Sequence, residues 1–145
     1  MASSQRSSSY PEAFRRVLAT VLILLIGLLV LQALGYGVGF VIDPESGVKE
    51  FGYEKPTVVE DLTVALVGLV GVGMLGVAAL LTLSAGLVWR GNPAGVYVAM
   101  AIGGSYVLAG LCAYRAEWWW DANFYNATGA MLIVLSAAVR WLQPR

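Results

Sequence analysis

Hydrophobic positions gather in four long stretches that contain no Asp, Glu, Lys, Arg or His. The stretches are residues 17–42, 62–89, 94–114 and 122–139. An apolar run of about 18 residues or more forms a helix long enough to cross the hydrocarbon core of a bilayer, which is roughly 30 Å thick. The pattern therefore predicts an all-α integral membrane protein, folded as a four-helix transmembrane bundle.

Polar residues mark where these helices are expected to begin and end. Residues 1–10 are polar and Ser-rich, which predicts a disordered tail before a single four-helix transmembrane domain over 11–145. Asp43 precedes Pro44, and a residue before proline is biased away from the α-helical region, so the first helix should end there. The segment 43–61, rich in acids and glycine, is expected to be the one sizeable loop, on the outer side.

The later helices have clear start signals. Asn92 and Pro93 are typical of a helix cap and a first helical position. The turn at this point is so short that the second and third helices should be antiparallel neighbours. Asp121 is the expected cap of the fourth helix, whose apolar stretch is the shortest and begins with polar turns. Whether that helix crosses the bilayer completely is left open.

The distribution of basic residues predicts the orientation. Lysine and arginine are retained on the cytoplasmic side of membrane proteins. One side of the predicted bundle has six of them and the other has three, which are respectively Arg6, Arg15, Arg16, Arg90, Arg140 and Arg145, and Lys49, Lys55 and Arg115. Both termini should therefore be cytoplasmic, in a multi-pass protein of the plasma (inner) membrane. The five tryptophans fall at the expected membrane boundaries, where aromatic rings concentrate.

Composition and charge narrow the partners and the chemistry. Hydrophobic residues make up 59% of the chain and charged residues 12%, and the net charge is zero, with no cluster of basic residues. Nucleic acid is therefore not an expected partner. The absence of histidine and the single cysteine argue against His-ligated haem, the usual zinc sites and iron–sulfur clusters, so no metal and no cofactor is expected. The expected partners are the lipid bilayer and either a second copy or another membrane protein.

Small residues spaced by four positions predict close helix contacts. Such stripes are Ala101, Ser105, Ala109 and Ala113 in the third helix, Ala78, Thr82 and Gly86 in the second, and Gly35 and Gly39 in the first. Two interpretations stay open for them. The stripes pack within the bundle, or they face a second copy or a larger partner.

Polar residues gather toward the outer face, where they suggest a shallow pocket. Its expected members are Arg115, Glu117, Asp121, Asn123, Asn126 and Tyr36. The alternative interpretation is that the charged residues are solvated or paired at the interface and that the asparagines bond to neighbouring helices. No catalytic residue is predicted, since Ser105 has neither a histidine nor a carboxylate or lysine within the apolar stretches to act as its base.

In outline the whole chain resembles the DoxX-like small four-helix membrane proteins. The resemblance rests on four spans, the first of them Gly-rich and ending at Asp43-Pro44, one longer outer loop and tight later turns. It implies a four-helix membrane fold. Some members of that group are described as accessory subunits of quinol oxidases or as partners of redox enzymes. No functional residue is carried over, because no specific motif is shared.

Three functional hypotheses follow from these observations. The first is a non-catalytic structural or accessory subunit of a membrane assembly. The second is a carrier or binding protein for a small apolar molecule, a lipid or a quinone, held between helices near the outer leaflet. The third is a membrane enzyme that uses the acids and Arg115 at the outer face.

Overall fold

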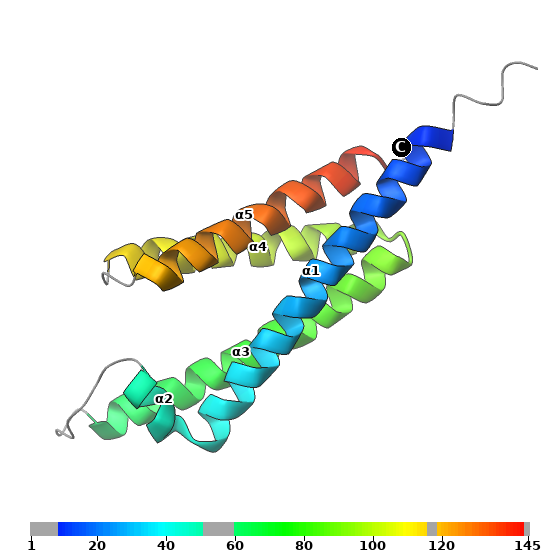
Figure 1. Ribbon diagram of the computed structural model, residues 1–145. Coiled ribbons are helices and arrows are strands. Elements are labelled where there is room, and N and C mark those ends of the chain that lie inside the picture. The colour runs from blue at the N-terminus through cyan, green and yellow to red at the C-terminus, as the bar shows by residue number, and fades with distance from the viewer. Residues whose placement is uncertain (1–8, 51–59, 116–118, 144–145) are drawn as a thin grey trace, which may run out of the picture. The chain divides into compact units, whose positions relative to one another are not determined.

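The computed structural model describes residues 9–50, 60–115 and 119–143. These residues form helices and no strand (Figure 1), namely α1 (Ser9–Ile42), α2 (Pro44–Glu50), α3 (Glu60–Trp89), α4 (Pro93–Arg115) and α5 (Trp119–Trp141). In this part of the chain four helices, α1, α3, α4 and α5, are long and apolar enough to cross a membrane. The prediction of an all-α, four-helix transmembrane protein is confirmed.

Two predicted boundaries are confirmed by local hydrogen bonds and helix ends. The first helix ends at Ile42, directly before the Asp43-Pro44 pair. At the α3–α4 turn the backbone N–H of Ala94 donates to the Asn92 side-chain oxygen at 2.9 Å, so Asn92 caps α4. Gly91 has a φ of 72°, a left-handed conformation that glycine adopts without steric cost. The chain therefore reverses within three residues.

The expected loop over 43–61 and the expected cap at Asp121 were wrong in part. The first residues of that loop form α2, because the Asp43 carboxylate accepts from the backbone N–H of Ser46 at 3.1 Å and from its hydroxyl at 2.7 Å. At the fourth span the helix already begins at Trp119, so Asp121 lies in the first turn of α5. With 23 residues α5 is about 35 Å long, enough to cross the hydrocarbon core. Residues 1–8 of the predicted tail, residues 51–59 of the predicted loop and Glu117 lie outside the described residues.

The chain divides into two compact units, and the prediction of a single domain stays a prediction. The first unit contains α1 up to Gly27, α3 from Leu81 onward, and all of α4 and α5. Its core side chains are fully or almost fully buried, among them Leu22, Ile26, Leu81, Val96, Leu132 and Val139. Within this unit α4 and α5 lie side by side as an antiparallel pair (Figure 1).

Glycines allow the helices of the first unit to approach closely. A Cβ atom placed on Gly103 of α4 would lie 2.9 Å from the Gly129 carbonyl oxygen, and one on Gly129 would lie 2.5 Å from the Gly103 oxygen. Between α3 and α4, the buried Ser84 hydroxyl donates to the Gly95 carbonyl at 2.7 Å. These contacts supply the close packing that holds helices together in lipid, where the hydrophobic effect between them is absent.

The second unit contains α1 from Leu28, α2, and α3 up to Leu80. Its buried cluster consists of Phe40 from α1, Val48 from α2 and Val67 from α3, so all three helices share one core. Here α1 and α3 meet at Gly37 and Gly71, since a Cβ on Gly71 would lie 2.9 Å from the Gly37 oxygen.

The expected small-residue stripes are only partly used for packing inside the units. In α4, Ala113 is buried, but Ala101, Ser105 and Ala109 are exposed. In α1, a Cβ on Gly35 or Gly39 would touch nothing within 4 Å. Close helix contacts in the described chain are instead made by other glycines, among them Gly37 and Gly103, each two positions away from a residue of a predicted stripe.

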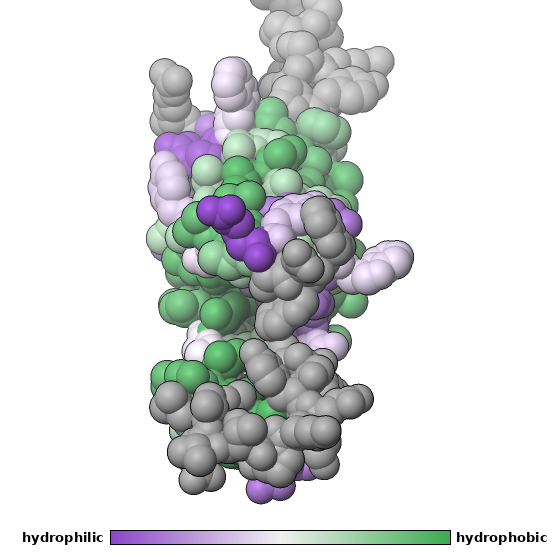
Figure 2. All heavy atoms as spheres, turned by 90° about the vertical axis from the view of Figure 1, so that its left-hand side faces the viewer, coloured by the Kyte–Doolittle hydropathy of each residue, from purple (hydrophilic) through white to green (hydrophobic). Residues whose placement is uncertain are grey.

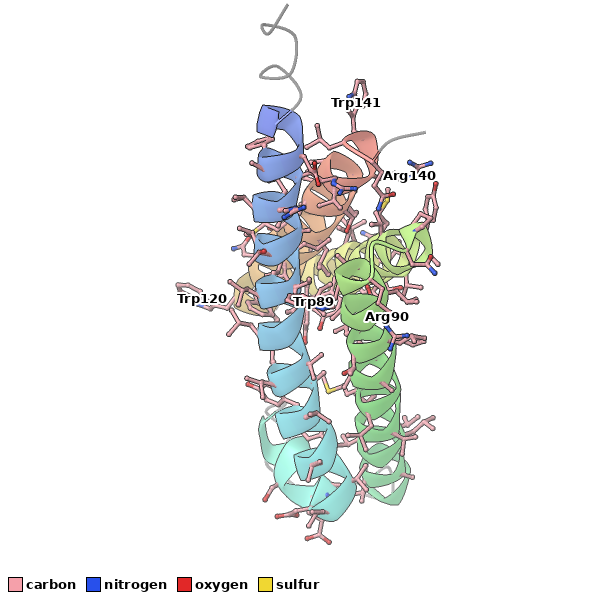
Figure 3. All side chains as sticks on the ribbon, turned by 90° about the vertical axis from the view of Figure 1, so that its right-hand side faces the viewer. Trp89, Arg90, Trp120, Arg140 and Trp141 are labelled. Carbon is pink, nitrogen blue, oxygen red and sulfur yellow. The ribbon has the colours of Figure 1, made fainter. Side chains whose placement is uncertain are left out.

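The outer surfaces of the helices have the character of a lipid-facing surface. Many large hydrophobic side chains are exposed, among them Leu24, Leu28, Leu31, Leu69 and Val134, and hydrophobic residues (green) flank the polar ones on the face seen in Figure 2. Trp120 and Trp141 project away from the helices at opposite ends of α5 (Figure 3) and are 90% and 88% exposed. Exposed tryptophans at the ends of an apolar helix match the aromatic belts of membrane proteins.

Candidate functional site

The predicted outer-face residues belong to two different units of the structure. Arg115 ends α4 and is exposed, and Asp121 and Asn123 are exposed in the first turns of α5. The Tyr114 hydroxyl donates to the Asn123 side-chain oxygen, which joins the adjacent ends of α4 and α5. Since Asn123 already accepts this bond from a neighbouring helix, its observed role is to connect the two helices.

Asn126 has a packing role at the same end of the first unit. Its half-buried amide lies over Gly110 of α4, because a Cβ on Gly110 would lie 2.7 Å from the amide carbon and nitrogen. The glycine is what leaves room for this side chain. The asparagines thus follow the alternative interpretation, in which they contact a neighbouring helix.

Tyr36 belongs to the second unit and lines a different feature. A groove of about 510 Å³ runs along α1 and onto α2, and we call it the α1–α2 groove. Its lining residues are Leu31, Gln32, Gly35, Tyr36, Gly39, Phe40, Asp43, Ser46 and Gly47. All of them lie within the second unit, so the groove is a property of that unit alone.

The groove follows one face of α1. Gln32, Tyr36 and Gly39 are spaced by four and three residues, which places them on the same side of a helix. Tyr36 also contacts Phe40, with ring centroids 5.8 Å apart and a tilt of 52° between the rings. The two aromatic rings therefore form one continuous part of the lining.

Two glycines keep the groove open. Gly35 and Gly39 are exposed, and a Cβ on either would meet no atom within 4 Å. Glycine in a helix is less favourable than alanine by roughly 1 kcal/mol, and no helix contact within the described chain requires either residue. Both instead line the groove, where a larger side chain would take up its space.

The short helix α2 forms the polar end of the groove. It is held against α1 and α3 by Gly47, where a Cβ would lie 2.7 Å from a Val67 methyl and 2.8 Å from the Phe40 ring. The Asp43 carboxylate caps α2 through Ser46, as described above, and both residues line the groove. Asp43 is the only charged residue among the described lining residues.

The groove-lining roles of Gln32, Gly35 and Gly39 were not predicted from the sequence. Gln32 is the one amide side chain in the 17–42 stretch, and it lies four residues before Tyr36. This spacing was the signal that could have predicted a shared polar face on α1. In the part of the chain that the structure describes, this half-buried amide has no hydrogen-bond partner. Gly35 and Gly39 were noticed, but as a helix contact.

Among the described residues no group of three or more Cys, Asp or Glu side chains is placed to hold a metal ion. Comparisons with protein-family models, with curated proteins and with solved structures find no match to this chain. The resemblance to the DoxX-like proteins therefore stays a prediction.

Proposed function

We propose that this chain is a non-catalytic integral membrane protein that holds a small apolar molecule, a lipid or a quinone, in the α1–α2 groove. The observation that supports it is the groove itself, which combines apolar and aromatic lining with a few polar groups at fixed positions. Sites for small molecules have this composition, and their volumes begin at about 300 Å³. Two glycines without a packing role inside the chain keep its space free.

Filling the groove should abolish binding without harming the fold. The variant Gly35→Leu/Gly39→Leu places two side chains into the groove, and neither new Cβ meets an atom within 4 Å. Leucine is also the better helix former, so stability should be unchanged or higher. After purification in mild detergent, mass spectrometry of the extracted small molecules should find a stoichiometric apolar compound with the native chain and at least tenfold less with the variant.

The matched control is Gly27→Leu/Gly73→Leu. These glycines are also exposed and open, in α1 and α3, but they do not line the groove. The control should retain the bound compound at the native level. Equal retention by both variants, or no bound compound with the native chain, contradicts the proposal.

A second candidate function is a structural or accessory subunit of a membrane assembly. It is favoured by the exposed stripe of Ala101, Ser105 and Ala109 on α4, which the α3 and α5 contacts of that helix leave uncovered within the first unit. Small residues at this spacing allow close approach of a further helix. Stoichiometric co-purification of another membrane protein, with no bound small molecule, would favour this function over the first.

We further propose that the protein lies in the plasma (inner) membrane with both termini in the cytoplasm. The excess of arginine at one side supports this orientation. A reporter fused after Arg145 should be active only in its cytoplasmic form, and the same reporter inserted after Gly52 should be active only in its exported form. Activity of the C-terminal fusion in the exported form would reject the orientation.

A further inference from the structure

The inference concerns what the α1–α2 groove binds, so it rests on the function proposed above. We propose that the occupant is the uncharged, carbonyl-bearing ring of a quinone, with the Gln32 amide donating a hydrogen bond to one ring carbonyl. Three properties of the groove lead to this class of molecule. They are the depth of Gln32, the lack of a hydrogen-bond partner for its amide in the described chain, and the aromatic residues one and two turns farther along α1.

Gln32 lies deep in the membrane-spanning part of α1. It precedes Asp43, the first charged residue after the span, by 11 residues, which corresponds to about 16 Å along the helix axis. Half of the hydrocarbon core is about 15 Å thick. Long side chains on a helix also lean toward its N-terminus, which here carries the amide farther from Asp43. The amide therefore sits near the middle of the hydrocarbon.

This depth excludes the bulk phospholipids as specific partners of Gln32. Their phosphate groups and ester carbonyls lie in the headgroup and interfacial layers, outside the hydrocarbon core. A group that meets Gln32 must be able to enter hydrocarbon, and a charged group there is costly. The partner of the amide is accordingly an uncharged oxygen on a molecule that dissolves in the bilayer interior.

The amide itself requires such a partner. An amide transferred from water into an apolar environment without a hydrogen bond costs several kcal/mol. Gln32 faces the groove and makes no hydrogen bond to another residue in the described chain. A carbonyl oxygen in the groove would accept from the amide nitrogen and remove that cost.

The aromatic residues and glycines favour a flat ring over a flexible chain. Tyr36 lies four residues beyond Gln32, about 6 Å along the axis, and its ring pairs with Phe40. Aromatic side chains contact other rings by offset or edge-to-face packing. Gly35 and Gly39 leave the helix backbone bare between these side chains, which suits a planar group. A ring with carbonyl oxygens and an apolar tail matches all three features.

The variant Gln32→Leu tests the hydrogen bond separately from the groove. Leucine keeps a similar size and removes an amide from hydrocarbon, so the variant should fold and melt at the native temperature or above. Binding of a decyl-substituted quinone to the purified protein in detergent should weaken by about tenfold, the size expected for one hydrogen bond in an apolar site. Binding of decylbenzene, which has the ring and tail but no carbonyl, should be the same for both proteins.

The outcomes separate this inference from the proposed function. If Gly35→Leu/Gly39→Leu abolishes quinone binding but Gln32→Leu leaves it unchanged, the groove binds a ligand and the inference is wrong. If a short-chain phospholipid displaces the quinone at equal concentration, the inference is also wrong. If native protein binds no quinone and cross-links as a dimer that Gln32→Leu abolishes, the amide serves a second copy and the inference is overturned.

Discussion

The variant Gly129→Val is expected to disrupt the α4–α5 pair. A Cβ at this position would lie 2.5 Å from the Gly103 carbonyl oxygen and 2.9 Å from the backbone nitrogen of Val107. Because both neighbours are backbone atoms of α4, no side-chain rotation relieves the clash, and the helices must separate. Overpacking of this kind costs typically 1–3 kcal/mol, and the branched side chain places the expected loss at about 3 kcal/mol. Thermal unfolding in detergent, followed by circular dichroism, measures it.

The control for this prediction is Gly104→Val. Gly104 is next to Gly103 on α4, but a Cβ there would meet no atom within 4 Å. Valine is a somewhat better helix former than glycine, so the stability of this control should be unchanged or slightly higher. If Gly104→Val lowers the melting temperature as much as Gly129→Val does, close α4–α5 packing is not what stabilises the first unit.

The variant Gly71→Leu is expected to destabilise the second unit and to abolish the groove. A Cβ on Gly71 would lie 2.9 Å from both the Gly37 oxygen and the Phe40 Cβ, and 3.0 Å from a Val41 methyl. The added side chain must force α1 away from α3, and Phe40 lines the groove from α1. We expect a loss of about 3 kcal/mol, together with loss of the bound compound.

Here the control is Gly73→Leu, two residues along α3, where a Cβ would meet nothing within 4 Å. It should leave both stability and binding unchanged. The comparison with Gly35→Leu/Gly39→Leu is informative, since that variant should lose the bound compound and keep its stability. Loss of the bound compound without any loss of stability in Gly71→Leu would show that this glycine is not a packing contact.

The fold followed from hydropathy, because the bilayer leaves few alternatives. A helix satisfies its own backbone hydrogen bonds in hydrocarbon, so long charge-free stretches predict spanning helices directly. The turn at Asn92 and Pro93 was equally predictable, since both residues have a local role. α2 was missed because its cap, Asp43, was interpreted only as the end of α1.

The helix contacts and the groove were harder to predict from one sequence. Glycine is frequent in this chain, and spacing alone does not distinguish Gly35 and Gly39, which touch nothing, from Gly37, which meets α3. A shift of one or two positions on a helix turns a residue to a different face. The groove depends on this rotation and on α2, so its lining could not be assembled from the periodicity of α1 alone. Tyr36 was predicted to share a pocket with Asn126, and the structure assigns the two residues to different units.

The reversal at Gly91 bears on how the chain enters the membrane. α3 and α4 are joined by three residues and fastened by the Ser84–Gly95 bond on the adjoining turns. This linker is too short for one helix to cross the bilayer while the other remains in water. During biosynthesis the two spans should consequently insert into the bilayer together, as one helical hairpin. The Ser84 hydroxyl then already has its hydrogen-bond partner when the hairpin leaves the aqueous phase.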